Sequence, residues 1–367
     1  MSDQICRWGI LGTAGIARKN WHSIRNCENA ALAAVASRSV ERAQQYIDEC
    51  QNDVSHSPAP RAIGTYEGML ASDDIDAVYI PLPTGMRAEW VIRAAEAGKH
   101  VVCEKPCGMD AAEVQKILDA CSQNNVQFMD GVMFMHSHRL HAIREALNDG
   151  TSVGDLRRIA TGFSFCAPDD FLEGNIRVSS QLEPMGCLGD LGWYNVRFTL
   201  WVMNYAMPTS VSGRLLSSIQ SGGSSAPTPT EFSGELFFDG GVSASFYCSF
   251  LTEHQQWAHV SGSKGHLHTD DFVLPFMGSE VAFDVSNHHF DITECHFNME
   301  RHTSRVAVSE YANNHPTAQE TNLFRTFSAQ VLSGTTDPHW GDIALKTQQV
   351  LDALVTSSQD SGAIVDL

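Results

Sequence analysis

The chain has 367 residues, of which 43% are hydrophobic and 18% are charged. This is the composition of a globular protein, and the length allows two domains with separate cores. The formal net charge of −19 argues against nucleic acid and anionic membrane surfaces as partners, because both would be repelled over most of the surface. No stretch approaches the run of about 18 apolar residues that a membrane span needs.

Cysteine and histidine usage gives no sign of a disulfide framework or a metal centre. The ten cysteines are scattered without a C-x-x-C pair, which favours buried thiols in a reducing compartment. The sixteen histidines lack matched ligand spacing, so no functional metal is predicted. The N-terminal segment MSDQICRWGILG carries only a short apolar run and is expected to be neither a signal nor a transit peptide. We therefore expect a cytoplasmic protein.

Residues 1–135 alternate short apolar strands with helical patterns, which indicates βαβ units around a parallel sheet. Strands are predicted at Arg7–Leu11, Leu32–Ala36, Ala77–Ile80, Val101–Cys103 and Gln127–Met129. Helices are expected to begin near Ile16, Val40, Tyr66, Met86 and Ala111. The predicted fold class is α/β, with a doubly wound Rossmann sheet in this first domain.

The pattern changes beyond Leu156, where alternating strands are separated by tight turns, as in an antiparallel sheet. Strands are predicted at 158–166, 210–216, 230–238, 242–251, 257–262 and 266–269, with helices at 137–147 and 188–202 and a flexible loop at 219–229. Helices at 317–332 and 343–356 are expected to return to the first domain. The predicted division nevertheless counts residues 136–340 as an α+β substrate and dimerisation domain, followed by a returning helix within 341–367.

The first strand runs into the segment GILGTAGIA, from Gly9 to Ala17, which fits a dinucleotide-binding turn. Gly12 would make the tight bend, and Ala14 replaces the usual second glycine where the backbone meets the pyrophosphate. The N-terminus of the next helix would offer its N–H groups to phosphate. A plain tight turn is the alternative. The residues assigned to cofactor binding here are Gly9, Gly12, Thr13, Ala14, Gly15 and Ile16.

The end of the second strand favours NADP over NAD. An NAD site usually places an acid there to hold the ribose hydroxyls, but the chain reads Ala36-Ser37-Arg38-Ser39. Arg38 offers a planar fork for a 2′-phosphate, and Ser37 and Ser39 add hydroxyl groups. A charge-assisted hydrogen bond is worth roughly 1.5 to 3 kcal/mol, so losing the fork should weaken NADP binding about tenfold or more. A solvated arginine at a helix start is the alternative.

Two further segments carry candidate catalytic groups. Lys105 follows a short apolar strand in GKHVVCEKP, at the carboxyl end, where parallel sheets bind ligands. In GCLGDLGWYN, Asp190 and Tyr194 are four residues apart and share one helical face. The alternatives are a solvated strand exit for Lys105, a first-turn acid that favours the helix dipole for Asp190, and a packed aromatic for Tyr194.

With GILGTAGIA, ASRS, GKHVVCEKP and GDLGWY in this order, the chain resembles the glucose-fructose oxidoreductase, inositol dehydrogenase and dimeric dihydrodiol dehydrogenase family over essentially its whole length. The resemblance implies a second domain with an open, mainly antiparallel sheet whose outer face commonly forms a dimer interface. It also implies a homodimer that oxidises or reduces a sugar, polyol or diol with NAD or NADP. By resemblance, Lys105 is the EKP lysine, Asp190 the helix aspartate and Tyr194 the acid/base position, where many sugar dehydrogenases carry His.

Two departures from the family pattern fall near the expected substrate or nicotinamide pocket. Arg87 stands where the group often has His, and the segment Met133-Phe134-Met135-His136 stands where many members have an aromatic-Arg pair. The predicted cofactor site is completed by Leu82, Pro83, Glu104 and Lys105. The predicted substrate-binding residues are Arg87, His136, Arg177, Asp190 and Tyr194. Solvated surface side chains are the alternative for His136 and Arg177.

The predicted mechanism moves a hydride between nicotinamide and a carbinol carbon while Tyr194 takes the hydroxyl proton. A free tyrosine has a pKa of about 10, and bringing it near neutral pH costs roughly 3 to 4 kcal/mol. An ammonium at about 4 Å with an effective dielectric of about 20 supplies about 4 kcal/mol, so Lys105 is sufficient. Asp190 would orient Lys105 or bind a substrate hydroxyl, and Lys105 is the alternative proton carrier. A cofactor-bound regulator and a redox-cycling glycosidase are the alternative functions on this fold.

Overall fold

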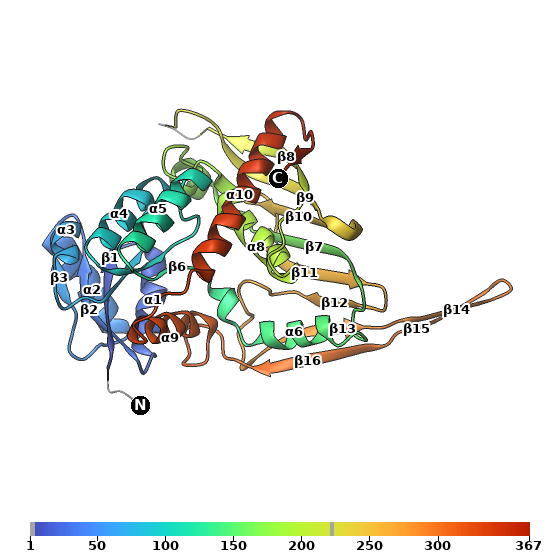
Figure 1. Ribbon diagram of the computed structural model, residues 1–367, viewed down its shortest axis with the longest axis horizontal. Coiled ribbons are helices and arrows are strands. Elements are labelled where there is room, and N and C mark those ends of the chain that lie inside the picture. The colour runs from blue at the N-terminus through green and yellow to red at the C-terminus, as the bar shows by residue number, and fades with distance from the viewer. Residues whose placement is uncertain (1–3, 221–223) are drawn as a thin grey trace. The chain divides into compact units, whose positions relative to one another are not determined.

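The computed structural model describes residues 4–220 and 224–367, which form two compact units (Figure 1). The first unit comprises Met1–His136, Gln181–Glu183 and Asn313–Gln349, and the second comprises Ser137–Ser180, Pro184–Ala312 and Val350–Leu367. Residues 1–3 of the N-terminal segment and 221–223 of the predicted loop lie outside the described residues. Within the described ranges, no helix combines the length and apolarity that a membrane crossing requires.

The first unit contains a six-stranded sheet in the order β3-β2-β1-β4-β5-β6, with every pairing parallel. Its strands are β1 (Cys6–Leu11), β2 (Ala30–Ala36), β3 (Arg61–Ile63), β4 (Ala77–Ile80), β5 (His100–Cys103) and β6 (Phe128–Asp130). Its helices are α1 (Gly15–Arg25), α2 (Val40–Asp53), α3 (Tyr66–Leu70), α4 (Thr84–Glu96), α5 (Ala111–Gln123), the 3₁₀ helix η1 (Met133–His136) and α9 (Gln319–Leu332). The strand order reverses between β1 and β4, and such a switch point opens a ligand crevice at the carboxyl ends of the strands.

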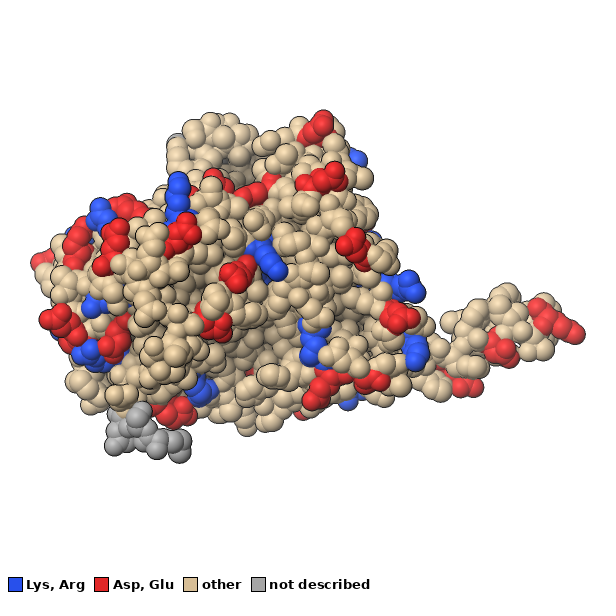
Figure 2. Space-filling view, in the orientation of Figure 1, with Lys and Arg blue, Asp and Glu red and all other residues tan. Residues whose placement is uncertain are grey.

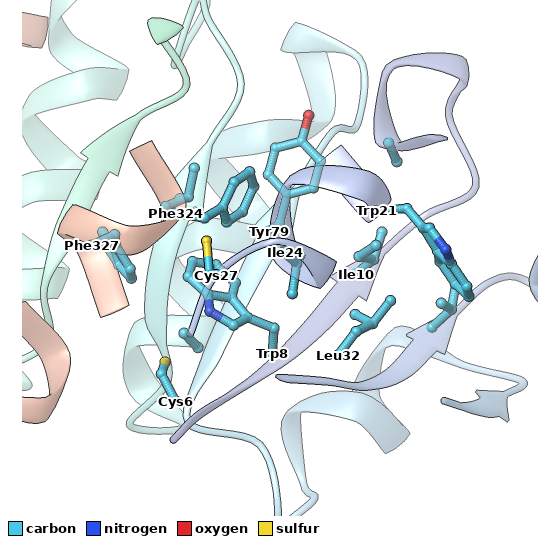
Figure 3. Packing of buried hydrophobic residues seen from close by; sticks show 14 of the residues in the cluster. Cys6, Trp8, Ile10, Trp21, Ile24, Cys27, Leu32, Tyr79, Phe324 and Phe327 are labelled. Atoms are coloured by element: carbon cyan, nitrogen blue, oxygen red, sulfur yellow. The ribbon is translucent and has the colours of Figure 1, made fainter. Parts of the chain in front are cut away.

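Helix α9 builds part of the first unit's core, as the expected return of the helix at 317–332 implies, whereas the predicted 136–340 division counted it with the second domain. The Phe324 ring lies 4.9 Å from that of Trp8 and 5.7 Å from that of Tyr79. The Trp8 indole N–H donates to Ser328 Oγ at 3.0 Å. Figure 3 shows α9 bringing Phe324 and Phe327 onto β1 and β4. The apolar face of α9 is therefore buried on the Rossmann sheet, despite its distance along the chain.

The first prediction concerns this core. Phe324 is 1% exposed, and replacing it with Ala should lower the free energy of unfolding by about 3 to 5 kcal/mol, because the large ring leaves a cavity. Denaturant titration followed by tryptophan fluorescence measures the change. Phe276→Ala is the control, since Phe276 is 61% exposed. Equal midpoints for the two variants would contradict the role given to α9.

The second unit contains a nine-stranded sheet in the order β16-β13-β12-β11-β7-β10-β9-β8-β17. Its strands are β7 (Leu156–Ser164), β8 (Ser210–Ile219), β9 (Thr228–Phe237), β10 (Ser243–Ser249), β11 (Gln255–Gly262), β12 (His266–Thr269), β13 (Glu280–Ser286), β16 (Thr303–Ser309) and β17 (Val365–Asp366). The β7–β10 pairing is parallel and the other pairings are antiparallel. This agrees with the predicted, mainly antiparallel second sheet.

The remaining elements of the second unit are mostly short. They are α6 (Arg139–Asn148), α7 (Asp169–Gly174), η2 (Ile176–Val178), η3 (Leu188–Gly192), α8 (Trp193–Val202), η4 (Asp239–Gly241) and the paired strands β14 (His289–Thr293) and β15 (His296–Glu300). Every residue of α8 is buried. Helix α10 (His339–Gln359) begins in the first unit and ends in the second.

Candidate active site

The turn between β1 and α1 has the geometry of a phosphate-binding loop. Gly12 has a φ of +119°, and a Cβ atom there would lie 3.0 Å from Leu82 Cδ2. Among the described residues, no side chain caps α1 at Ala14, and no acid lies in its first turn. No described atom lies within 4 Å of the position a Gly15 Cβ would take. The helix start is therefore open and electropositive, which suits an anion.

Gly9 was predicted to bind the cofactor, but the structure gives another reason for its small size. It is buried in β1, and an added Cβ would lie 2.5 Å from Met69 Sδ. Gly9 therefore allows α3 to pack against β1. Leu82, from the same predicted set, packs its side chain against Gly12.

Two arginines lie where the predicted 2′-phosphate site would be. Ser39 caps α2, its Oγ accepting from Arg42 N at 3.2 Å, while Arg42 Nε donates to Thr13 Oγ1 at 3.0 Å. Burial raises the pKa of the Tyr66 phenol, and the charges of Arg38 and Arg42 oppose that rise, so both guanidinium groups lie near this ring. Arg42 was missed from the sequence. Arg42 lies three residues after the capping serine, within the first turn of α2, and that position was the sequence feature that could have identified it.

A groove of about 500 Å³ lies beside α2 and is lined in part by Thr13, Ser39 and Arg42. Arg38 is exposed, whereas Ser37 is buried and its N–H donates to the Ile63 carbonyl at 3.0 Å. Arg38 and Arg42 are both exposed, and a third exposed arginine, Arg18, lines the groove and pairs with Glu49.

The carboxyl end of β5 holds two buried charged residues. Glu104 accepts a hydrogen bond from the Tyr79 hydroxyl at 2.5 Å. Burial raises the pKa of Tyr79, and the nearby Glu104 carboxylate raises it further. Lys105, the next residue, is only 8% exposed. Glu104 is thus bonded into the sheet by Tyr79, and Lys105 lies buried at the strand end, where parallel sheets bind ligands.

Arg87 was predicted to bind substrate, but its guanidinium lies within a network of protein groups. It is 6% exposed, and its Nε donates to the Leu82 carbonyl at 2.7 Å. Its Nη1 donates to Thr84 Oγ1 at 2.7 Å and to the Pro106 carbonyl. The side chain therefore ties the end of β4 to the residue that follows Lys105. This geometry holds the loop that carries Lys105.

A short strap, Gln181–Glu183, completes the start of α4. Thr84 N and Oγ1 donate to the Glu183 carboxylate at 3.1 and 2.5 Å, and Gly85 N donates to the Leu182 carbonyl at 3.0 Å. A Cβ on Gly85 would lie 2.6 Å from the Gln181 carbonyl oxygen, so the strap needs a glycine beneath it. Glu183 also lies 3.8 Å from Arg87 Nη2. Pro83, predicted to contact cofactor, is the residue that precedes this helix.

His136 is also part of the first unit's packing. Its ring stacks on Trp340, with centroids 4.7 Å apart and planes 26° apart, and its carbonyl accepts from Asn322 Nδ2 at 3.2 Å. The side chain is 9% exposed. The predicted substrate contact of His136 therefore competes with an extensive structural role.

In the second unit, two predicted substrate residues form an ion pair. Arg177 Nε lies 2.8 Å from Asp190 Oδ2, and the Asp190 side chain is 16% exposed. Asp190 lies on η3, a π-helical turn that precedes α8, whereas a continuous α-helix was predicted over 188–202. Such π-helical turns are frequent at functional sites, where they change the directions in which neighbouring side chains point.

Tyr194 follows this π-helical turn in the first turn of α8. It is 7% exposed, and its ring packs edge to face on Phe163, with centroids 5.7 Å apart. Lys105 belongs to the first unit, and Asp190, Arg177 and Tyr194 belong to the second. Across residues 4–220 and 224–367, no group of three His, Cys, Asp or Glu side chains is arranged to hold a metal ion.

Comparisons with known proteins match both units. The family model described as the oxidoreductase family, NAD-binding Rossmann fold, matches residues 6–132. The GFO/IDH/MocA C-terminal domain matches residues 140–268.

Relatives and solved structures extend this match along the chain. D-xylose 1-dehydrogenase (NADP(+)) 2 of Haloferax volcanii is 30% identical over 98% of this chain and 99% of its own length. Trans-1,2-dihydrobenzene-1,2-diol dehydrogenase of Mus musculus is 29% identical over 71% of this chain and 72% of its own length. A 3-ketoreductase from Actinomadura kijaniata, in complex with TDP-benzene and NADP, has a TM-score of 0.80 at 23% identity and covers 96% of this chain and 98% of its own. At that identity it supports the fold alone.

Proposed function

We propose, because the chain belongs to the GFO/IDH/MocA family of oxidoreductases, that it transfers a hydride between NADP and a carbinol or carbonyl carbon of a sugar, polyol or diol. The choice of NADP over NAD rests on Arg38 and Arg42, whose charges both act on Tyr66. An NAD site would have an acid at the end of the second strand instead. The relative from Haloferax volcanii bears NADP in its name, and the 3-ketoreductase was solved with NADP.

The residues present fit this cofactor. The start of α1 at Ala14 and Gly15 is open to a phosphate, and the two guanidinium groups offer planar donors to a second one. Both lie on an otherwise acidic chain with a net charge of −19. When bound, the nicotinamide ring supplies the acceptor or donor of the hydride.

In this proposal Tyr194 exchanges the proton of the substrate hydroxyl, and Lys105 supplies the positive charge that lowers the phenol's pKa. Asp190 binds a substrate hydroxyl, and Arg177 orients its carboxylate through the 2.8 Å ion pair. Arg87 is a positioning residue, because it bonds to the Pro106 carbonyl directly after Lys105.

The second prediction tests the cofactor. Arg38→Ala and Arg42→Ala should each raise KM for NADP about tenfold or more, because each removes a charge-assisted contact to the 2′-phosphate. KM for NAD should change little, since NAD lacks that phosphate. Arg61→Ala is the control, because Arg61, the first residue of β3, is exposed and pairs with Asp74. Equal losses with both cofactors would count against a 2′-phosphate site.

The function itself is tested by screening aldoses, inositols and diols for substrate-dependent change in NADP(H) absorbance. Stoichiometric change identifies a dehydrogenase or reductase. Glycoside cleavage without net change would favour a redox-cycling glycosidase, and cofactor binding with neither would favour a regulator. We also propose a homodimer, as the family resemblance implies, and a cytoplasmic location, which the scattered cysteines favour.

A further inference from the structure

A two-stranded ribbon, here called the arm and defined as residues 288–302, projects from the second unit between β13 and β16 (Figure 1). Its strands β14 and β15 pair in register from His289 with Glu300 to Thr293 with His296. All ten strand residues are exposed. The arm lies beyond the segment matched by the family's C-terminal domain, which ends at residue 268.

One face of the arm is apolar. Phe290 pairs with Met299 and Ile292 pairs with Phe297, and alternate residues of a strand share a face, so all four side chains lie together. The rings of Phe290 and Phe297 stack with centroids 6.2 Å apart and planes 13° apart. The exposed fractions are 54% for Phe290, 52% for Ile292, 69% for Phe297 and 75% for Met299. The polar residues Asp291 and Asn298 occupy the opposite face.

This alternation is typical of a ribbon that buries one face. An isolated two-stranded hairpin is marginally stable in water, so a cover for the apolar face would stabilise the arm. At these exposures the four side chains present on the order of 400 Å² of apolar surface, enough to mark an interaction site. Because the four are exposed, the described part of the chain leaves this face largely uncovered.

The apolar face adjoins a concave surface at the base of the arm. A cavity of about 410 Å³ is lined by Met299 of the arm and by His259, His266 and His268 of the sheet. The rings of His259 and His266 stack with centroids 4.7 Å apart. Burial lowers the pKa of each, and neighbouring histidines lower it further. The same cavity is also lined by His288, Asp284, Glu300 and Arg301, so Met299 is its apolar edge within a polar lining.

We propose that the arm embraces a second copy of this chain, with its apolar face packed into the concave surface between the arm and sheet of the partner. The inference rests on the homodimer in the proposed function and names the element that holds it. Each copy has the same arm and the same concave surface, so the two copies can bind each other symmetrically, as a two-fold interface requires.

The uncharged apolar face suits contact between two acidic copies, and its area shows what else the interface must include. Two chains of net charge −19 repel each other, and the apolar face lets them meet without a formal charge. Figure 2 shows acidic side chains toward the end of the arm, which would disfavour anionic lipid or nucleic acid there. Two arms would bury roughly 800 Å² of their own surface, and the sheet beneath must supply the rest of a stable interface of about 1,200 to 2,000 Å².

The experiment compares full-length variants by sedimentation velocity over a dilution series. Phe297→Asp puts a charge on the apolar face and should raise the dimer Kd about 30-fold or more. Asn298→Asp adds the same charge on the opposite face of β15 and should leave the Kd unchanged. Circular dichroism and thermal melting of both variants establish that they are folded.

The outcomes separate this inference from the enzyme proposal. A dimeric wild type with selective dissociation of Phe297→Asp supports the arm. Dimers in both variants would overturn the arm while leaving the homodimer in place, and equal dissociation of both would overturn the choice of face. A monomeric wild type would overturn the homodimer and the arm together. NADP-linked turnover is measured separately, so its absence would bear on the function alone.

Discussion

Replacing Tyr194 with Phe is expected to lower kcat by about 10²- to 10⁴-fold, a loss of roughly 3 to 5 kcal/mol of transition-state stabilisation. The substitution removes only the hydroxyl group that would exchange the proton. The ring keeps its edge-to-face contact with Phe163, and the position stays buried at 7% exposure, so folding should be preserved. Steady-state oxidation of the best substrate with NADP measures the effect, and KM for NADP should stay nearly unchanged.

Tyr311→Phe is the matched control, because it removes the same group from a residue that is 44% exposed. The pH profile gives a second readout. A phenol that acts as base makes kcat/KM for oxidation rise with pH through its pKa, and this limb should vanish in Tyr194→Phe. Near-normal turnover in that variant would remove Tyr194 from the mechanism and leave Lys105 as the proton carrier.

The strands and helices around the nucleotide site could be predicted because their signals are local. Apolar runs such as Ala77–Ile80 have the length of buried parallel strands, and capping residues such as Ser39 and Asp110 mark helix starts. Strand β3 was missed because its residues, from Arg61 to Ile63, are at most half-buried at the sheet edge. The arm strands were missed for the same reason, because an exposed ribbon lacks a buried run.

The return of α9 to the first domain was expected, but its core contacts and the structural bonding of Arg87 could not be predicted from local pattern. The apolar face of α9 identifies a helix, but only packing against Trp8 and Tyr79 assigns it to the first unit. A basic residue near a strand end fits both substrate binding and structural bonding. Hydrogen bonds to the carbonyls of Leu82 and Pro106 give Arg87 a structural role, and Pro106 lies on another loop, 19 residues away.

Lys105→Met is expected to lower kcat about 10²- to 10³-fold, the loss typical of removing one preorganised electrostatic group from an active site. The chain supplies a matched control in Lys99, since both lysines are 8% exposed and they flank the same strand, β5. Lys99 Nζ donates to the carbonyls of Ser72 and Ile75 at 2.7 and 3.0 Å. Lys99→Met should therefore lower the free energy of unfolding by about 1 to 3 kcal/mol and spare turnover in the folded fraction.

The contrast follows from the direction of β5. Lys99 precedes the strand, at the amino end of the parallel sheet, away from the ligand-binding edge. Lys105 follows the strand at the carboxyl end, where parallel sheets bind ligands. If Lys105 acts by lowering the pKa of Tyr194, removing both groups should cost little more than removing Tyr194 alone, because the lysine then has no phenol to act on. Purely multiplicative losses in the double variant would show that the two residues act independently. Each would then need a separate role in the reaction.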